Sequence, residues 1–194
     1  MTKLNLIGAQ PFETKRCRLR SFKKGDEEFI YNNWASSDNV TKYLTWNTHK
    51  TPEDSRLWCE YMMEESAKLD SFRWGIELAE TGELIGQIDV VALDKDKGVA
   101  ELGWCIGEKW WNKGIMTECA EAVLAYLIFV IGFSQVRACH DVDNLASGRV
   151  MEKVGLRYKG ERQCEVPLKG ITVTVKDYSI TNEQWYSDNI RLRK

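Results

Sequence analysis

One stretch, Glu101-Leu-Gly-Trp-Cys-Ile-Gly-Glu-Lys-Trp-Trp-Asn-Lys-Gly-Ile-Met-Thr-Glu118, decides how this chain folds. From Val99 to Ile106 the side chains alternate between two faces, which predicts a strand. Beyond Gly114 an apolar run continues to Phe133 and predicts a helix. The loop between them brings backbone N–H groups to the helix start, where they lack intrahelical acceptors and the helix dipole adds partial positive charge. A strand, a loop with glycine and a helix N-terminus together predict a phosphate-binding site.

A second stretch, Asp141-Val-Asp-Asn-Leu-Ala-Ser-Gly-Arg-Val-Met-Glu-Lys-Val-Gly-Leu156, narrows this interpretation, because Gly114 alone also fits an ordinary turn. Together the two stretches resemble the GNAT superfamily of N-acetyltransferases, in its RimJ/RimL-like branch. In that family the motif Gln/Arg-x-x-Gly-x-Gly/Ala wraps the diphosphate of coenzyme A. The segment Trp111-Asn-Lys-Gly-Ile-Met116 matches the central glycine of the motif, whereas Trp111 and Met116 depart from it at the outer positions.

The resemblance extends to the N-terminal region, where the branch's opening pattern is present as Thr14-Lys-Arg-Cys-Arg-Leu-Arg20, with Cys17 in place of Leu. It implies an α/β (α+β) fold: a mixed, mostly antiparallel, seven-stranded sheet with helices on both faces and a splayed central strand pair. We expect a single domain over residues 1–194, with its core at about 14–181 and a C-terminal tail at 182–194. The predicted strands cover residues 14–21, 72–80, 84–93, 99–106, 135–140, 156–166 and 171–181.

Helix signals separate these strands. Thr51-Pro-Glu-Asp54 combines an N-cap residue, a first-turn proline and two acids, and predicts a helix that continues to about Leu69. Asn144 is a plausible N-cap for a helix that ends before Gly155. Because a long helix connects the strands at 99–106 and 135–140, we expect these two strands to be parallel.

The resemblance implies acetyl-CoA as the co-substrate. The loop and the first helical turn would bind the diphosphate, and the end of the preceding strand would offer backbone groups to the pantetheine arm as an added strand does. Asn144 would cap the next helix and bind the same arm. The residues expected to bind acetyl-CoA are Trp104, Cys105, Ile106, Trp111, Asn112, Lys113, Gly114, Ile115, Met116, Thr117, Asn144 and Ser147.

Acetyl transfer to an amine needs a proton acceptor for the amine and a proton donor for the leaving thiolate. We expect Glu101 to accept the proton, directly or through water, with Asp89 as a weaker candidate; a plain ion pair with a lysine is the alternative for Glu101. Much of the superfamily donates from a Tyr seven residues after the motif Asn, a position held here by Met151. The branch instead carries a serine, here Ser147, implied to protonate or hydrogen-bond the sulfur, although a capping role also fits.

The acceptor is expected to be a small-molecule or peptide amine of unassigned identity. In this family the first two helices and their connection wall the acceptor pocket, so Tyr43 and Trp46 are expected substrate contacts, together with Asp89 and Glu101. A core or loop role is the alternative for the two aromatic residues.

The composition argues against several classes of partner. The chain has 194 residues, of which 43% are hydrophobic, and a net charge of −2 with dispersed Lys and Arg, so no nucleic-acid partner is expected. Its longest apolar run is too short to span a membrane. Six scattered cysteines and two histidines predict no metal site and fit a reducing, cytoplasmic setting. Monomer and homodimer are both compatible with the sequence.

Two other functions fit parts of the sequence. Met116 and Met151 suggest a non-catalytic acyl-CoA-binding or sensor protein on the same fold. A nucleotide-phosphate-binding α/β protein would need a parallel sheet, which the hairpins predicted at Gly82 and Gly170 disfavour.

Overall fold

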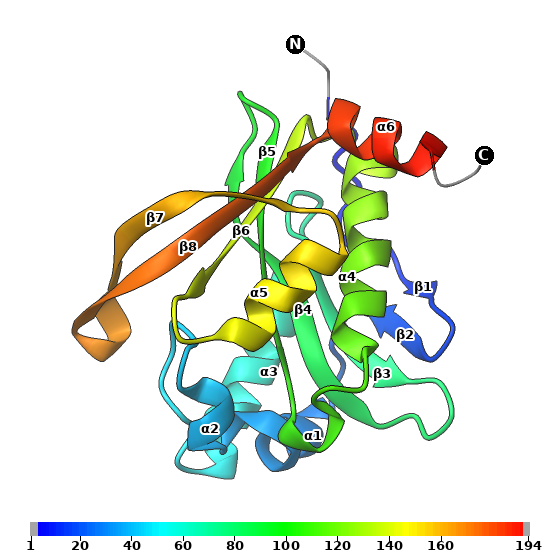
Figure 1. Ribbon diagram of the computed structural model, residues 1–194. Helices are drawn as coiled ribbons and strands as arrows, with labels where there is room; N and C mark the ends of the chain where they lie inside the picture. Colours follow the sequence, from blue (N-terminus) through cyan, green and yellow to red (C-terminus); the bar gives the residue numbers. More distant parts are fainter. Residues whose placement is uncertain (1–3, 192–194) are drawn as a thin grey trace.

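The computed structural model describes residues 4–191, which build one eight-stranded sheet in the order β1-β2-β3-β4-β5-β6-β8-β7 (Figure 1). All neighbouring strands are antiparallel except β5 and β6. The mixed, mostly antiparallel architecture and the parallel crossover are therefore as expected. The strands are β1 (Phe12–Glu13), β2 (Cys17–Arg20), β3 (Arg73–Leu78), β4 (Leu84–Asp94), β5 (Val99–Ile106), β6 (Gln135–Asp141), β7 (Arg157–Val166) and β8 (Ile171–Thr181).

The expected count of seven strands was wrong by one, because β1 was missed. Its two residues pair with β2, Phe12 opposite Leu19 and Glu13 opposite Arg18. Two residues are too few to show an alternating pattern. What fixes β1 is a long-range contact: the Phe12 ring lies 5.9 Å from the ring of Trp74 and 5.7 Å from that of Tyr126.

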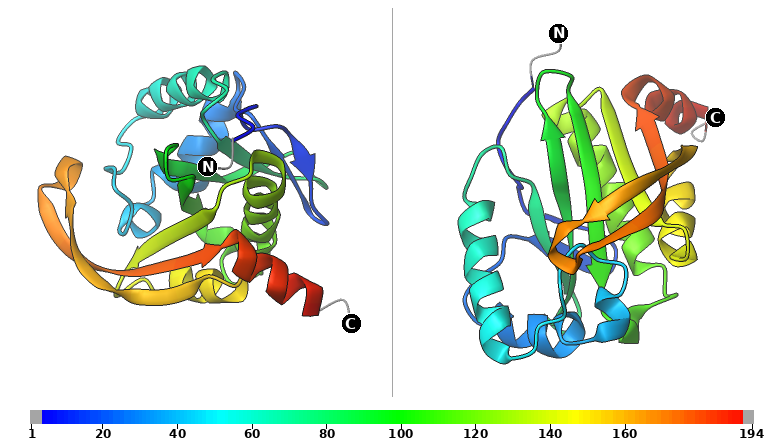
Figure 2. Two further views of the ribbon diagram at one scale, coloured as in Figure 1. Left: turned by 90° about the horizontal axis from the view of Figure 1, so that it is seen from above. Right: turned by 90° about the vertical axis from the view of Figure 1, so that its left-hand side faces the viewer.

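Helices cover both faces of the sheet, as expected (Figure 2). One buried cluster joins the first helices to the sheet through residues such as Trp34, Met62 and Leu84, and a second joins α4 and α5 to the opposite face through Val123 and Met151. The helices are α1 (Asp26–Ile30), α2 (Asp38–Thr41), α3 (Pro52–Ser66), α4 (Ile115–Tyr126), α5 (Leu145–Lys153) and α6 (Asn182–Arg191). Short 3-10 turns lie at Glu108–Trp110 and Pro167–Lys169, and π-helical turns at Tyr31–Ala35 and Leu127–Ile131 extend α1 and α4.

The predicted start of α3 is confirmed in detail. Thr51 is the N-cap, and its hydroxyl accepts a hydrogen bond from the Asp54 backbone N–H. The Asp54 carboxylate in turn accepts from the Thr51 backbone N–H at 2.8 Å. This reciprocal pair satisfies two N–H groups that the helix itself cannot pair. The helix ends at Ser66, three residues before the predicted Leu69.

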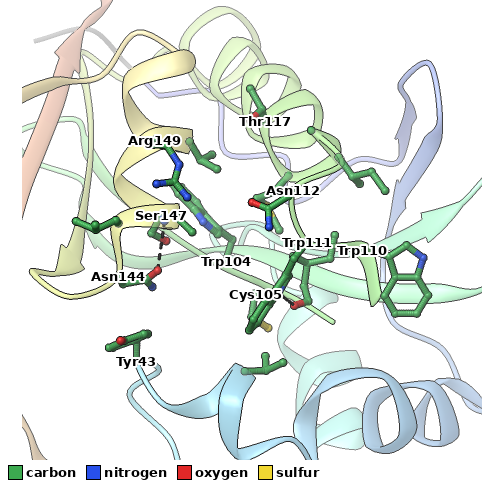
Figure 3. A pocket seen from close by; sticks show the side chains of 18 of the residues that line it. Tyr43, Trp104, Cys105, Trp110, Trp111, Asn112, Thr117, Asn144, Ser147 and Arg149 are labelled. Carbon is green, nitrogen blue, oxygen red and sulfur yellow. Dashed lines mark hydrogen bonds between the residues drawn. The ribbon is translucent and has the colours of Figure 1, made fainter. Parts of the chain in front are cut away.

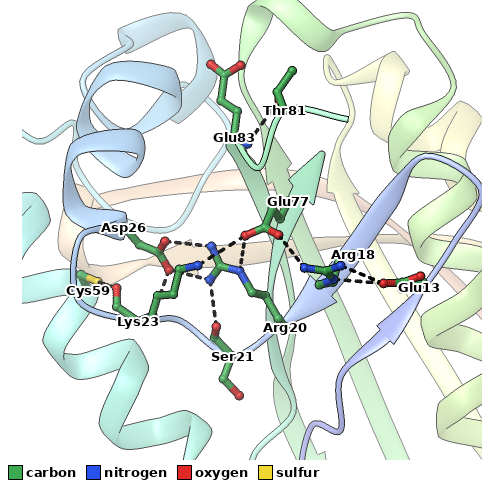
Figure 4. A network of polar contacts seen from close by, with 10 residues as sticks. All are labelled: Glu13, Arg18, Arg20, Ser21, Lys23, Asp26, Cys59, Glu77, Thr81 and Glu83. Carbon is green, nitrogen blue, oxygen red and sulfur yellow. Dashed lines mark hydrogen bonds and ion pairs between the residues drawn. The ribbon is translucent and has the colours of Figure 1, made fainter. Parts of the chain in front are cut away.

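An ion-pair network fastens β2 to β3 and α1 (Figure 4). Arg20 donates from Nη1 to Asp26 at 2.7 Å and from Nε to Glu77 at 2.6 Å. Both carboxylates are buried, with exposed fractions of 1% for Asp26 and 5% for Glu77. Burial of charge is tolerated here because each carboxylate has a bonded cation.

The central strand pair is splayed, as the resemblance implied. The β5–β6 ladder runs from Val99 opposite Gln135 to Leu102 opposite Ala138 and then stops. Beyond that point β5 continues to pair with β4, and β6 with β8. The two halves of the sheet therefore diverge, and one backbone edge of β5 has no strand partner within residues 4–191 from Gly103 onward. None of the helices in this part of the chain has the length and apolar character that crossing a membrane requires.

Candidate active site

A cavity of about 520 Å³ occupies the splay between β5 and β6 (Figure 3). Its walls come from the end of β5, the loop and first turn of α4, one side of α5 along its whole length, and α2 with the residues that follow it. Most residues expected to bind the co-substrate meet there. Those that line the cavity are Trp104, Cys105, Ile106, Trp111, Asn112, Gly114, Ile115, Met116, Thr117, Asn144 and Ser147, together with the expected acceptor contact Tyr43.

The loop before α4 has a backbone shaped for anion binding. Asn112 and Gly114 both adopt the left-handed conformation, with φ of 58° and 72°. Asparagine tolerates this conformation better than most residues, and glycine adopts it freely. The first intrahelical bond of α4 runs from Glu118 N to Gly114 O at 3.1 Å, so the preceding N–H groups have no acceptor within the helix. These donors sit at the positive end of the helix dipole, at the cavity wall.

Met116, at the outer position of the motif, belongs both to the core and to the cavity wall. Met116 is buried, with its side chain in the core cluster beneath α4, although part of the residue also lines the cavity. A large residue at this position of the motif is therefore buried against the core and at the same time forms part of the cavity wall.

The exposed edge of β5 is partly closed by Trp111. Its indole Nε1–H donates to the Ile106 carbonyl at 2.7 Å, so this carbonyl is already satisfied by the protein. The edge at Trp104 and Cys105 borders the cavity without a β6 partner. Of the three strand residues expected to offer backbone groups to a ligand, Ile106 therefore already has its carbonyl bonded within the protein, and its N–H takes no part in that bond.

Helix α5 brings Ser147 to the cavity. Asn144 is the N-cap, and its side-chain oxygen accepts from the Ser147 backbone N–H at 3.3 Å (Figure 3). Ser147 therefore takes part in the cap through its backbone, which leaves the hydroxyl available for another role. Further along the same helix, Arg149 and Lys153 add positive charge to the same wall.

Four expected site residues lie outside the cavity lining: Trp46, Asp89, Glu101 and Lys113. The carbonyl of Lys113 points at Arg16, which is not part of the cavity lining, and accepts a hydrogen bond from Nη1 of Arg16 at 2.8 Å. Trp46 belongs to an aromatic cluster, with its ring 5.7 Å from that of Trp58 and 5.2 Å from that of His49.

Glu101 is engaged in an ion pair. Its Oε2 accepts from Nε of Arg137 at 2.8 Å, and the Cys139 thiol lies 3.8 Å from Oε1. The predicted alternative of an ion pair is therefore realised with an arginine on the parallel neighbour rather than with a lysine. A strand advances about 3.3 Å per residue, so Glu101 lies about 13 Å along β5 from Cys105 at the cavity wall.

Asp89 is a buried carboxyl group without a bonded cation. Its exposed fraction is 4%, Oδ2 accepts from the Gln87 amide at 2.8 Å, and Oδ1 has no hydrogen-bond partner in the described part of the chain. Burial raises the pKa of Asp89 to about 7, against the opposing influence of Arg73 and of the Gln87 bond. It lies opposite Gly103 on β5, about two residues nearer the cavity wall than Glu101.

Cys105 is poorly suited to act as a nucleophile. Burial raises the pKa of its thiol well above the usual range, and the neighbouring Asp89 raises it further. The reactive thiolate is therefore disfavoured. Within residues 4–191 no group of three or more His, Cys, Asp or Glu side chains is arranged to hold a metal ion.

Several residues of the cavity wall were not expected from the sequence. On α5, Ala146, Arg149, Val150 and Lys153 share the helical spacing of one face, which is the signal that could have found them. The residues contributed by α2 carry no comparable signal, because their position depends on how that segment packs. The missed residues are Asn39, Val40, Leu44, Trp110, Asp143, Leu145, Ala146, Arg149, Val150 and Lys153.

Comparison with known proteins gives a consistent result. The family described as acetyltransferase (GNAT) domain matches residues 16–157. The uncharacterized N-acetyltransferase YoaA of Bacillus subtilis (strain 168) is 30% identical over 168 residues, covering 87% of this chain and 94% of YoaA. A GNAT-family acetyltransferase structure from Bacillus anthracis matches with a TM-score of 0.79 and 26% identity, covering 90% of this chain and 99% of that chain. The microcin C7 self-immunity acetyltransferase MccE, solved with acetyl-CoA and AMP, shares the fold, with a TM-score of 0.75 and 20% identity over 86% of this chain and 93% of that chain.

Proposed function

This chain belongs to the GNAT acetyltransferase family, and from that premise we propose that it transfers the acetyl group of acetyl-CoA to a primary amine. The expected enzyme class, an acetyltransferase, agrees with the family and with the N-acetyltransferase relatives. A structural neighbour solved with acetyl-CoA supports this acyl donor. The acceptor, a small-molecule or peptide amine, and the direct attack in a ternary complex are parts of the proposal.

The observation that carries the proposal is the cavity in the splay. Its loop presents N–H donors around the left-handed Gly114, which suits a diphosphate. The adjoining free edge of β5, from Trp104 to Ile106, suits the amide groups of a pantetheine arm, which can pair as an added strand would. Arg149 and Lys153 supply positive charge for a polyanionic ligand.

Ser147 is the proposed proton donor. Its hydroxyl is not used by the helix cap and its residue lines the same cavity as the β5 edge. When acetyl-CoA is bound there, it supplies an activated acyl group. The neutral amine nitrogen would form a bond to the acetyl carbon while the carbon–sulfur bond breaks, and the proton lost by the amine would pass to the proton acceptor. The Ser147 hydroxyl would give a proton to the sulfur and regain one from solvent.

Two carboxyl groups compete as the proton acceptor for the amine. Glu101 would act directly or through water, but Arg137 already holds it. The pKa of Asp89, raised by burial to about 7, leaves it partly ionised near neutral pH, which is the useful range for a base. We propose Glu101 as the base. Asp89 is the weaker candidate for the same role and is also proposed to bind the cationic acceptor.

The decisive experiment compares two glycines of the same backbone conformation. Gly114 has φ of 72° and Gly82 has φ of 71°, and neither has a neighbour that a Cβ would collide with. Gly114→Val is expected to weaken acetyl-CoA binding by tenfold or more in calorimetry, since valine forces the loop out of the left-handed conformation. Gly82→Val carries the same strain in the β3–β4 turn and should bind within twofold of the unmodified protein.

Catalysis is then tested by release of free thiol from acetyl-CoA in the presence of peptides, polyamines and aminoglycosides, with products read by mass. Acetylated product and thiol release support the enzyme. Tight binding without release on any acceptor favours the non-catalytic sensor that Met116 and Met151 suggested. Equal affinities of Gly114→Val and the unmodified protein would contradict the location of the diphosphate site.

A further inference from the structure

Arg16, at the corner that leads into β2, reaches the loop that precedes α4. Its Nη1 donates to the Lys113 carbonyl at 2.8 Å, and its Nε donates to Oε2 of Glu118 at 2.7 Å. The remaining nitrogen, Nη2, lies 3.7 Å from the position that a Cβ on Gly114 would take. One guanidinium group therefore contacts both sides of the left-handed glycine.

Glu118, in the first turn of α4, is itself firmly held. Its Oε1 accepts from the Thr14 hydroxyl at 2.6 Å and from the Arg16 backbone N–H at 2.8 Å. Partial burial works to raise the pKa of Glu118, but the bonds from Thr14 and Arg16 outweigh it and lower that pKa below its ordinary value. Glu118 therefore stays ionised at neutral pH and keeps Arg16 in one orientation.

The contact at Lys113 sets the direction of a neighbouring donor. A peptide group is planar and trans, so its C=O and its N–H point in opposite directions. Because the Lys113 carbonyl points at Arg16, the N–H of Gly114 in the same peptide group points away from Arg16. Gly114 lines the cavity, whereas Lys113 does not.

We propose that Arg16, held by Glu118 and Thr14, is a positioning residue that aims the Gly114 N–H at the diphosphate of the co-substrate. This inference rests on the proposed function. It assigns a role to two sequence patterns, Thr14-Lys-Arg16 and Thr117-Glu118, that lie about a hundred residues apart and meet only in the folded chain. The Arg16 side chain is 42% exposed, and an ion pair this exposed, here with Glu118, adds little to the free energy of unfolding. We therefore expect the contact to act on the conformation of the loop before α4.

The test uses two ligands and four proteins. The ligands are acetyl-CoA and S-acetylpantetheine, which lacks the diphosphate, with affinities measured by direct and displacement calorimetry. The variants are Arg16→Ala, Arg16→Lys and, as a matched control two residues further along the chain in β2, Arg18→Ala, whose side chain is bonded to Glu13 and Glu77 instead of the loop. Thermal melting of each variant reports on the fold.

Arg16→Ala is expected to weaken acetyl-CoA binding about tenfold and to leave S-acetylpantetheine binding unchanged. Arg16→Lys keeps the charge but cannot bond Glu118 and the Lys113 carbonyl as a fork does, so it should recover only a minor part of the loss. Arg18→Ala should match the unmodified protein for both ligands.

Four results would overturn the inference. Equal loss for both ligands would show a general structural effect, and full recovery in Arg16→Lys would show that charge alone matters. A third result is an unchanged acetyl-CoA affinity in Arg16→Ala although Gly114→Val still weakens binding. That result would show that Arg16 does not position the loop, and it would leave the proposed function intact. If the unmodified protein binds the two ligands equally well, the diphosphate site itself fails and the inference falls with it.

Discussion

Two sites with buried acidic side chains differ in whether a cation is hydrogen-bonded to the carboxyl groups. At the junction of β2, β3 and α1, Asp26 and Glu77 share the guanidinium of Arg20 through bonds of 2.6 to 2.9 Å (Figure 4). On β4, Asp89 is as deeply buried, yet its only bonded partner in the described part of the chain is the neutral amide of Gln87. The first site has a cation hydrogen-bonded to both carboxylates, whereas at the second Arg73, opposite Asp89 on β3, makes no hydrogen bond to it in the described part of the chain.

The difference separates a structural role from a chemical one. A buried carboxylate with a bonded cation remains ionised and links the elements around it. A buried carboxyl without one shifts its pKa toward neutrality and destabilises the fold whenever it ionises. Groups of the second kind cluster at functional sites. Asp89 lies on the strand beside the splay, which is where such a group would be useful.

The largest expected effect comes from breaking the first site. Arg20→Ala leaves Asp26 and Glu77 buried without their shared cation and should lower the free energy of unfolding by roughly 3–5 kcal/mol. Urea denaturation measures this loss. Arg18→Ala is the control, since Arg18 is half exposed and Glu77 keeps its bond to Arg20, and its loss should be about 1 kcal/mol or less. Equal losses in the two variants would contradict the comparison.

The second prediction concerns the pH dependence of stability at Asp89. Its pKa is about 7 in the folded chain and near its ordinary value of 3.8 when unfolded, so the folded state binds the proton more tightly. Asp89 therefore does not lower the free energy of unfolding below pH 4. As the pH rises from 4 through 7, its ionisation lowers that free energy by about 4 kcal/mol in total.

Asp89→Asn removes this penalty, because the amide stays neutral. Urea denaturation should show the variant to be more stable than the unmodified protein at pH 8 and equal to it at pH 4. Asp96→Asn, in the exposed turn after β4, should show no such difference. A variant that is less stable at pH 8 would mean that the ionised form of Asp89 has a partner that stabilises it.

The third prediction concerns the hydroxyl at the cavity wall. Ser147→Ala should lower kcat roughly 100-fold, because the leaving sulfur loses its proton donor, while acetyl-CoA affinity stays within threefold. Ser147→Thr keeps a hydroxyl and should recover part of the rate. An unaltered kcat at saturating substrate would remove Ser147 from the mechanism.

The smallest effect is expected at Glu101. Glu101→Gln should lower kcat about tenfold, less than a directly placed base contributes, because Glu101 stands outside the cavity lining and is paired with Arg137. Steady-state kinetics of Glu101→Gln and Asp89→Asn, measured side by side, rank the two carboxyl groups. A greater loss of kcat in Asp89→Asn would transfer the role of base to Asp89.

The parts of this molecule that could be predicted from its sequence are those fixed by neighbours in the chain. The α3 start depends on Thr51 and Asp54, three residues apart, and the α5 start depends on Asn144 and Ser147. The phosphate-type loop required only a strand, Gly114 and a helix in succession.

The remainder depends on contacts between distant segments. Nothing near Asp89 in the sequence indicates that its carboxyl is buried without a bonded cation: strand register places Arg73 opposite it on β3, yet no hydrogen bond joins the two within the described residues. The bond between Arg16 and Glu118 spans 102 residues. Strand β1 is fixed by the contacts of Phe12 with Trp74 and Tyr126, and a two-residue sequence does not indicate contacts with such distant residues.

The early end of the β5–β6 ladder has a consequence for the lifetime of the protein. Four residue pairs, from Val99–Gln135 to Leu102–Ala138, make up the whole parallel seam between the two halves of the sheet. A ligand that bridges the halves beyond this seam binds only the native chain, and at 100 times its dissociation constant it adds about 2.7 kcal/mol to the free energy of unfolding. Resistance to heat and to proteolysis would then follow the supply of the acyl donor.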